Sequence, residues 1–171
     1  MKEKNLALEM LKKLIERKIK SVARKNLIIS EKFSERLEKI IKSYQNKAIN
    51  NFDTIEELIK MAKEMVEAEN SGKKLGLSDD EMAFYSALTK DEKIKELMKD
   101  EILIKIVKEL AKTMKNSMTI DWRRKESVQA NMRREIKRLL RDNDYPPKDA
   151  EDATEKVLEQ AKLFNDQRMD Y

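Results

Sequence analysis

The chain of 171 residues is rich in charge, with 38 Lys and Arg against 33 Asp and Glu and a formal net charge of +5 at pH 7. It contains no Cys and no His. This excludes disulfides, thiol nucleophiles, zinc sites built on thiolate or imidazole, and catalytic triads that use a histidine base. Two Gly and two Pro leave little material for hairpins and barrels, so the composition predicts an all-α fold.

Three segments with a helical spacing of apolar residues open the chain, at residues 5–25, about 30–48 and 53–70. Leu14 accompanies the apolar stripe of the first segment, and Ile59 and Val66 belong to the stripe of the third. Asp53 is the expected N-cap of the third helix, because its carboxylate can accept hydrogen bonds from exposed backbone N–H groups.

Signals for a helix end and a new helix start then follow one another closely. Asn70–Gly72 predicts the end of the third helix. Ser78 and Glu81 have the spacing of a capping box, which predicts a new start. We therefore predict an N-terminal helical hairpin arm over residues 1–71 and a multi-helix bundle over residues 72–171.

Further helix signals continue to the end of the chain. Thr89 and Glu92 repeat the capping-box spacing and predict another start, and Pro146-Pro147 suits the N-terminus of the last helix. Methionines on the apolar stripes are interpreted as core residues: Met61, Met65, Met82, Met98, Met114, Met118 and Met132.

Charge alternates in blocks along the chain. Residues 1–48 carry a net charge of +8, residues 49–120 of −3, residues 121–141 of +5, and residues 142–171 of −5. Basic blocks attract phosphate or an acidic protein surface, whereas acidic blocks repel DNA.

No catalytic motif emerges from these residues. The two glycines cannot supply a dinucleotide fingerprint or a P-loop. Two acidic triplets that include a lysine, Glu16-Arg17-Lys18 and Asp91-Glu92-Lys93, superficially suggest a Mg²⁺ nuclease centre. Such triplets arise by chance in a chain this rich in Lys and Glu, and they fall on expected helices, so we interpret them as solvated surface.

Membrane and export signals are also lacking in the sequence. No apolar run approaches the roughly 18 residues of a membrane-spanning helix, and the first residues lack the apolar core of a signal peptide. We expect a cytoplasmic protein.

A single tryptophan, Trp122, is followed directly by Arg123, Arg124 and Lys125. Trp and Arg dominate interaction hot spots, and Arg binds phosphate with two parallel hydrogen bonds. The group is therefore a candidate contact with a partner or with DNA. The alternative is that Trp122 fills the core at a turn between two helices, with Asp121 as the cap of the helix that follows.

A basic helix is predicted over residues 123–141. Its cations are spaced so that they lie off the apolar stripe of Met132, Ile136 and Leu139 or Leu140. An ordinary solvated face and a docking surface for duplex phosphate or for an acidic protein all fit this pattern. We favour a protein contact, because the acidic residues 142–171 follow directly. The candidate contact residues are Arg133, Arg134, Lys137 and Arg138, together with Trp122, Arg123 and Arg124.

Several blocks together resemble a known family. They are Leu75-Gly76-Leu77-Ser78 with Glu81 and Ala83-Phe84-Tyr85; Thr119-Ile120-Asp121-Trp122 with Glu126-Ser127-Val128; Met132-Arg133 with Lys137-Arg138-Leu139-Leu140; and Tyr145-Pro146-Pro147 with Val157-Leu158-Glu159-Gln160-Ala161. This combination is similar to the C-terminal helical region of the restriction (R) subunit of type I restriction–modification enzymes. Asn143-Asp144 replaces the Gly that members of this family often have before Tyr145, and Asn143 can adopt the same left-handed backbone.

The resemblance implies a role without chemistry of its own. In that family the R subunit is an ATP- and Mg²⁺-dependent DNA translocase and endonuclease, and its helical region packs on the motor. The region is thought to help dock the motor on the methyltransferase core of modification and specificity subunits. The resemblance implies these partners for the present chain, with duplex DNA as an alternative, and no catalytic, cofactor or metal site. Because nuclease and ATPase motifs are missing, we expect a fragment of a longer subunit.

Overall fold

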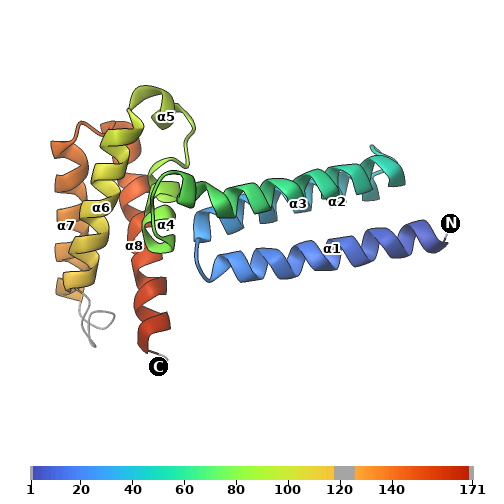
Figure 1. Ribbon diagram of the computed structural model, residues 1–171, viewed down its shortest axis with the longest axis horizontal. Helices are drawn as coiled ribbons and strands as arrows, with labels where there is room; N and C mark the ends of the chain where they lie inside the picture. Colours follow the sequence, from blue (N-terminus) through green and yellow to red (C-terminus); the bar gives the residue numbers. More distant parts are fainter. Residues whose placement is uncertain (1, 118–125, 170–171) are drawn as a thin grey trace. The chain divides into compact units, whose positions relative to one another are not determined.

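Every secondary-structure element of the described residues is a helix (Figure 1). The computed structural model describes residues 2–117 and 126–169, with side chains for residues 6–116 and 126–167. The helices are α1 (Lys2–Ala23), α2 (Leu27–Gln45), α3 (Asn51–Lys74), α4 (Asp79–Leu88), α5 (Lys93–Leu97), α6 (Asp100–Ser117), α7 (Glu126–Asp142) and α8 (Pro147–Met169). The all-α prediction is confirmed.

The chain divides into two compact units, Met1–Lys74 (unit 1) and Leu75–Tyr171 (unit 2). Helix α3 does not end at Asn70–Gly72, as the sequence predicts, but continues to Lys74. Gly72 is buried inside this helix, so packing outweighs its low helix propensity. The residue with a left-handed backbone comes later, at Gly76, whose φ is +72°.

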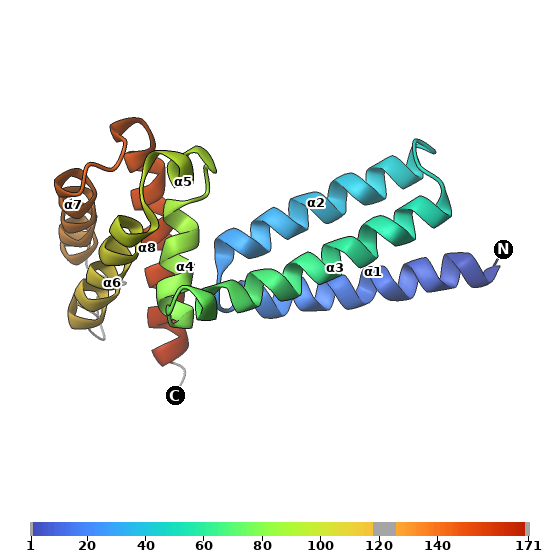
Figure 2. The same ribbon diagram turned by 45° about the horizontal axis from the view of Figure 1, so that its top comes forward.

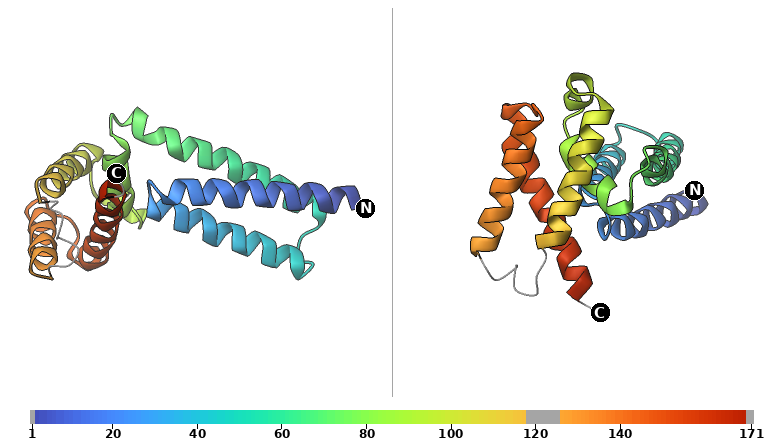
Figure 3. Two further views of the ribbon diagram at one scale, coloured as in Figure 1. Left: turned by 90° about the horizontal axis from the view of Figure 1, so that it is seen from below. Right: turned by 60° about the vertical axis from the view of Figure 1, so that its left-hand side comes forward.

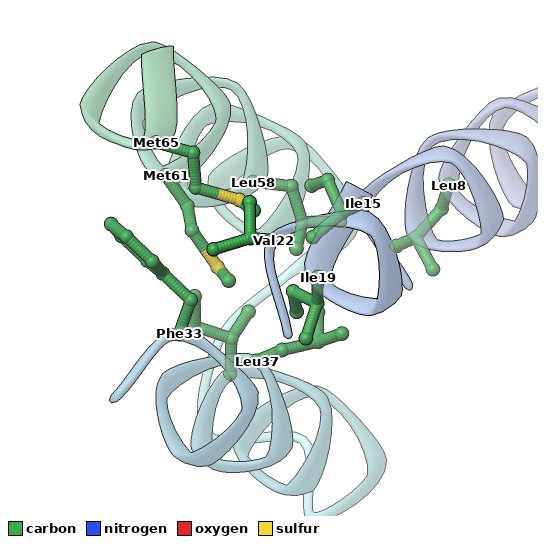
Figure 4. Close-up of a cluster of buried hydrophobic side chains, with 10 residues drawn as sticks. Leu8, Ile15, Ile19, Val22, Phe33, Leu37, Leu58, Met61 and Met65 are labelled. Carbon is green, nitrogen blue, oxygen red and sulfur yellow. The ribbon is translucent and has the colours of Figure 1, made fainter. Parts of the chain in front are cut away.

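Unit 1 is a bundle of three long helices around an apolar core. The predicted hairpin of α1 and α2 is completed by α3, which packs against both (Figure 2). Figure 4 shows the side chains that meet between the three helices. The buried members are Leu8, Ile15, Ile19 and Val22 on α1, Phe33, Leu37 and Ile40 on α2, and Leu58, Met61 and Met65 on α3.

Two asparagines begin helices of unit 1. The side chain of Asn26 accepts a hydrogen bond from the backbone N–H of Ile29 at 3.1 Å, which places the start of α2 at Leu27. The side chain of Asn50 accepts from the backbone N–H of Asp53 at 2.7 Å. The predicted N-cap at Asp53 is therefore wrong, since Asp53 lies in the first turn of α3.

Unit 2 is built on four helices that pack in a cycle. Helix α4 contacts α6 and α8, and α7 contacts the same two helices (Figures 1 and 3). Phe84 and Phe164 meet edge to face, with ring centroids 5.8 Å apart. The buried hydroxyl of Tyr145 donates to the carbonyl oxygen of Leu88 at 2.6 Å. Burial raises the pKa of Tyr145 above its usual range.

Local signals placed two of the helix starts in unit 2 correctly. The capping box of Ser78 and Glu81 is present, with both reciprocal hydrogen bonds formed, and α8 begins at Pro147. Thr89 does not open a helix. It is the C-cap of α4, and its hydroxyl donates to the carbonyl oxygen of Tyr85 at 2.8 Å.

Two further expectations concern turn and core residues. The left-handed residue before Tyr145 is Asp144, with φ of 59°, and not Asn143. Among the methionines assigned to the core, Met82 is half-buried and Met118 lies outside the described residues. The other five are buried, namely Met61, Met65, Met98, Met114 and Met132.

Candidate partner-binding surface on helix α7

Helix α7 has one apolar stripe that is fully covered. Met132, Ile136 and Leu140 follow one another at four-residue steps and are buried. Helices α6 and α8 pack against this side. Because an α-helix has 3.6 residues per turn, residues between these positions lie on the flanks and on the outer side of α7. Exposed on that outer side are Arg134, Lys137, Arg138 and Arg141.

Arg133 lies on the flank toward α8 and is occupied by an ion pair within unit 2. Its Nε donates to Glu155 Oε1 at 2.6 Å, and its Nη2 donates to Glu155 Oε2 at 3.4 Å. The hydrogen bond from Arg133 holds the pKa of Glu155 below its ordinary value, and the same bond raises the pKa of Arg133. Arg133 therefore joins α7 to α8 and offers less to a partner than the sequence suggests.

The other three candidate cations on α7 differ in their surroundings. Arg134 donates to the side-chain oxygen of Asn131 on its own helix. Arg138 forms an ion pair with Glu135 at 2.8 Å, one turn earlier. Lys137 is exposed, and its charge contributes to the lowered pKa of Glu155. Arg134 and Arg138 are thus bonded to exposed residues of α7, and all three side chains are exposed, so they can reach an intermolecular partner.

A shallow groove of about 290 Å³ separates α7 from α6. Its floor includes Leu110, Ile136 and Leu139. Its rim mixes the cations Lys112 and Arg138 with the carboxylates Glu109, Glu135 and Asp142. A phosphate placed here would meet three carboxylates, which disfavours binding of nucleic acid on this side of α7.

The predicted cluster Trp122, Arg123 and Arg124 lies outside the described residues. The structure consequently brings together only the α7 members of the candidate site. Sequence reasoning missed Glu155 as the partner of Arg133. The available signal was the net charge of −5 over residues 142–171, which places carboxylates on the helix next to α7.

The acidic triplets with lysine have ordinary structural roles. Lys18 forms an ion pair with Glu69 on α3 at 2.9 Å. The carboxylate of Asp91 accepts a hydrogen bond from the backbone N–H of Lys93 at 3.0 Å. Within the part of the chain that the structure describes, no group of three or more acidic side chains is arranged to hold a metal ion. None of the described helices is long and apolar enough to cross a membrane.

The fold and this surface define a charge-rich, all-α protein of two helical units. Comparison with known proteins gives its family. Residues 1–167 match a family model. Its description is the C-terminal region of proteins like the type I restriction enzyme HindI endonuclease subunit. The chain belongs to this family.

Two curated relatives support this assignment. The type I restriction enzyme HindI endonuclease subunit of Haemophilus influenzae is 37% identical over 159 residues, which are 93% of this chain and 15% of the relative. A putative type I restriction enzyme MjaIXP endonuclease subunit of Methanocaldococcus jannaschii is 36% identical over 138 residues, which are 80% of this chain and 13% of the relative. The chain thus spans about one seventh of the length of these relatives. No solved structure matches it significantly.

Proposed function

We propose that the chain is a non-catalytic helical C-terminal region of a type I restriction endonuclease R subunit. In this proposal it packs on the ATP-dependent DNA-translocating motor and docks that motor on the methyltransferase core of modification and specificity subunits. The family match over residues 1–167 supports the place of the chain within such a subunit. The fold supports a non-catalytic role, because the described residues form helices with buried apolar stripes and charged outer faces.

The observation that carries the docking proposal is the outer side of α7. Arg134, Lys137 and Arg138 are exposed there, while the opposite stripe of the same helix is anchored in the core. A helix fixed in this way presents its cations at defined positions, so little conformational freedom is lost when a partner binds. An acidic surface on a modification or specificity subunit would complement these charges.

Contact with duplex DNA is the second candidate function. Exposed arginines and lysines on one helix favour it, because phosphate contacts supply most of non-specific DNA affinity. The carboxylates around the α6–α7 groove and on α8 oppose it, since they would face the same phosphates. We therefore place the protein contact first.

The test is a triple charge reversal, Arg134→Glu, Lys137→Glu and Arg138→Glu. Arg133 is left intact because its reversal would set a carboxylate against Glu155. Binding of the full chain to purified modification and specificity subunits is measured by pull-down and sedimentation, and binding to duplex DNA is titrated with salt. We expect the reversal to weaken assembly with the subunits. Exposed charge changes usually alter stability by less than about 0.5 kcal/mol each, and the thermal unfolding midpoint checks that the fold is kept.

The matched control reverses three exposed lysines elsewhere in unit 2, Lys93, Lys99 and Lys105. It changes the net charge equally and should leave assembly unchanged. If instead DNA affinity falls, with a log–log salt slope reduced by about one for each lost contact, duplex DNA is the partner. If the α7 reversal changes neither binding reaction, its outer side is an ordinary solvated surface.

A further inference from the structure

A second candidate interaction surface lies on unit 1, away from its core. Six large apolar side chains of α1 and α3 are between 43 and 66% exposed: Leu6, Met10 and Leu14 on α1, and Phe52, Ile59 and Val66 on α3. The sequence places Leu14, Ile59 and Val66 on the same apolar stripes as core residues. In the structure they lie outside the core. On each of these helices, apolar residues cover more of the helix surface than the two neighbouring helices bury.

The two exposed stripes lie on the same side of unit 1. Lys18 on α1 and Glu69 on α3 form an ion pair at 2.9 Å, which marks the side on which these helices face each other. Leu14 lies one turn before Lys18, and Val66 lies one turn before Glu69. Residues three or four apart share a helix face, so both stripes border the α1–α3 contact.

The remaining exposed apolar residues extend this surface along both helices. Met10 and Leu6 continue the α1 stripe in steps of four residues, and Ile59 and Phe52 continue the α3 stripe in steps of seven. Figure 1 shows α1 running alongside α3, with α2 behind α3, which agrees with the contact between α1 and α3. We call the set Leu6, Met10, Leu14, Phe52, Ile59 and Val66 the α1–α3 apolar face.

Charge is distributed unevenly along the edges of this face. On α1, three exposed cations follow one another in steps of four and three residues and form a stripe beside Met10 and Leu14, namely Lys13, Arg17 and Lys20. On α3, the outer edge carries both signs, with Glu56, Lys60, Lys63 and Glu67 exposed. Exposed Glu9 and Glu16 lie on the same helix as these cations, farther from the apolar stripe than Arg17, so the α1 edge carries both signs with an excess of positive charge.

We propose that the α1–α3 apolar face binds an amphipathic helix whose apolar side chains are bordered by carboxylates. α1 and α3 together present apolar residues on one outer side of the three-helix unit 1. One more helix packed against them would bury these residues and form a four-helix bundle. Contiguous exposed apolar patches mark interaction sites in soluble proteins. Carboxylates on the partner would meet Lys13, Arg17 and Lys20.

Charge also decides against a second copy of this chain as the partner. In a two-fold symmetric pair formed through this face, the positive α1 edge of one copy would lie over the α1 edge or over the mixed-sign α3 edge of the other, depending on the direction of the axis. Neither edge supplies a row of carboxylates. Residues 1–48 carry a net charge of +8, and like charges brought together in an interface are costly. The proposal does not depend on the function assigned to α7, because the residues involved all belong to unit 1.

The test uses the full chain and a displayed library of helical peptides. The peptides carry Leu at helical spacing, and the positions beside the Leu stripe vary among Glu, Lys and Gln. We expect selection for binders to enrich Glu at these positions. Binding of the selected peptides should weaken at least about tenfold in the variant Met10→Gln, Leu14→Gln, Ile59→Gln, which removes exposed apolar surface only. It should be unchanged in Leu97→Gln, a control that is 70% exposed in unit 2.

A charge-swapped variant, Lys13→Glu, Arg17→Glu, Lys20→Glu, provides the second arm. It should lose the Glu-rich peptides and select Lys-rich peptides from the same library. Circular dichroism and the thermal midpoint show that each variant is folded. The proposal is overturned if no peptide is enriched, if the enriched peptides show no charge bias, or if the apolar variant binds them normally. A dimer that the apolar variant abolishes would assign the face to a second copy instead. Binding to phosphatidylglycerol vesicles that the same variant abolishes would assign it to a membrane surface.

Discussion

The pair of Arg133 and Glu155 shows that sequence spacing alone does not reveal what an arginine binds. By sequence, Arg133 belongs to the same basic group as Arg134 and Lys137. In the structure its guanidinium makes two hydrogen bonds with one carboxylate of α8, a geometry that arginine forms well and lysine cannot. Residues of the same type, one position apart, are thus used differently. Arg133 connects two helices, and Arg134 remains at the surface.

This pair predicts a pH dependence of stability. The pKa of Glu155 is lowered in the folded chain, so its contribution to stability is present above the unfolded pKa and is lost as pH falls through the folded pKa. We expect Glu155→Gln to lower the thermal midpoint slightly at pH 7, since both side chains are partly exposed. The midpoints of the two proteins should converge in acid, as measured by thermal unfolding from pH 7 down to pH 3.

The control for this prediction is Glu151→Gln, an exposed position one turn earlier on α8. It removes the same charge without removing the Arg133 pair and should reproduce little of the neutral-pH effect. A constant difference between Glu155→Gln and the wild type over the whole pH range would contradict the role assigned to this carboxylate.

At the scale of one element, the start of α4 is specified by its own residues. Ser78 Oγ accepts from the backbone N–H of Glu81 at 3.2 Å, and the Glu81 carboxylate accepts from the backbone N–H of Ser78 at 2.9 Å. Three acidic residues occupy the first turn, where the helix dipole favours negative charge. The following residues of α4, from Ala83 to Leu88, are all buried.

We therefore predict that Ser78→Ala destabilises unit 2 by about 1 kcal/mol, within a range of roughly 0.5–2 kcal/mol for the loss of such a cap. Denaturant unfolding followed by circular dichroism measures this change. Ser78→Asp keeps a side-chain oxygen for the Glu81 N–H and should retain most of the stability. Equal losses in the two variants would show that the hydroxyl contributes through something other than capping.

Most helices and their order were predictable from sequence, but several boundaries and the break between α5 and α6 were not. Apolar spacing and strong local signals, such as Ser78 with Glu81 and Pro147, placed the helices correctly. The starts and ends near Asp53, Gly72 and Thr89 were wrong, because each depends on a competing partner. Asn50 takes the cap position of α3, burial keeps Gly72 helical, and the Thr89 hydroxyl bonds back to α4.

At the scale of the whole chain, each unit has a core of its own. The buried cluster of unit 1 draws all of its members from residues 8 to 65, and Met61 in this cluster is fully buried. We predict that Met61→Ala destabilises unit 1 by about 2–5 kcal/mol, as large-to-small substitutions at buried sites do. Hydrogen exchange of the backbone amides of unit 1 should accelerate accordingly.

Leu14→Ala is the matched control for this core substitution. It also shortens an apolar side chain of unit 1, but Leu14 is 58% exposed, and changes at such positions usually stay within about 0.5 kcal/mol. A loss of stability in Leu14→Ala as large as in Met61→Ala would mean that Leu14 is covered in solution.

The candidate surfaces were only partly predictable, because periodicity shows where apolar residues recur but not how wide an area the neighbouring helices cover. It separated Met132, Ile136 and Leu140 from the cations of α7 correctly. For Leu14 and Ile59 it gave no warning of exposure, since their spacing equals that of core residues. The structure alone shows that α1 and α3 have more apolar surface than unit 1 buries.

The junction between the two units has a consequence for how such chains can be recombined. Gly76 has a left-handed backbone and no neighbouring atom within 4 Å of the position its Cβ would occupy. The next helix then begins with a cap supplied by Ser78 and Glu81 alone. The side chains that cap the start of α4 therefore all follow this glycine in the sequence. Relatives could exchange their first units by a crossover at Gly76 without disturbing the hydrogen bonds that begin α4, so that one form of the second unit could be inherited together with different first units.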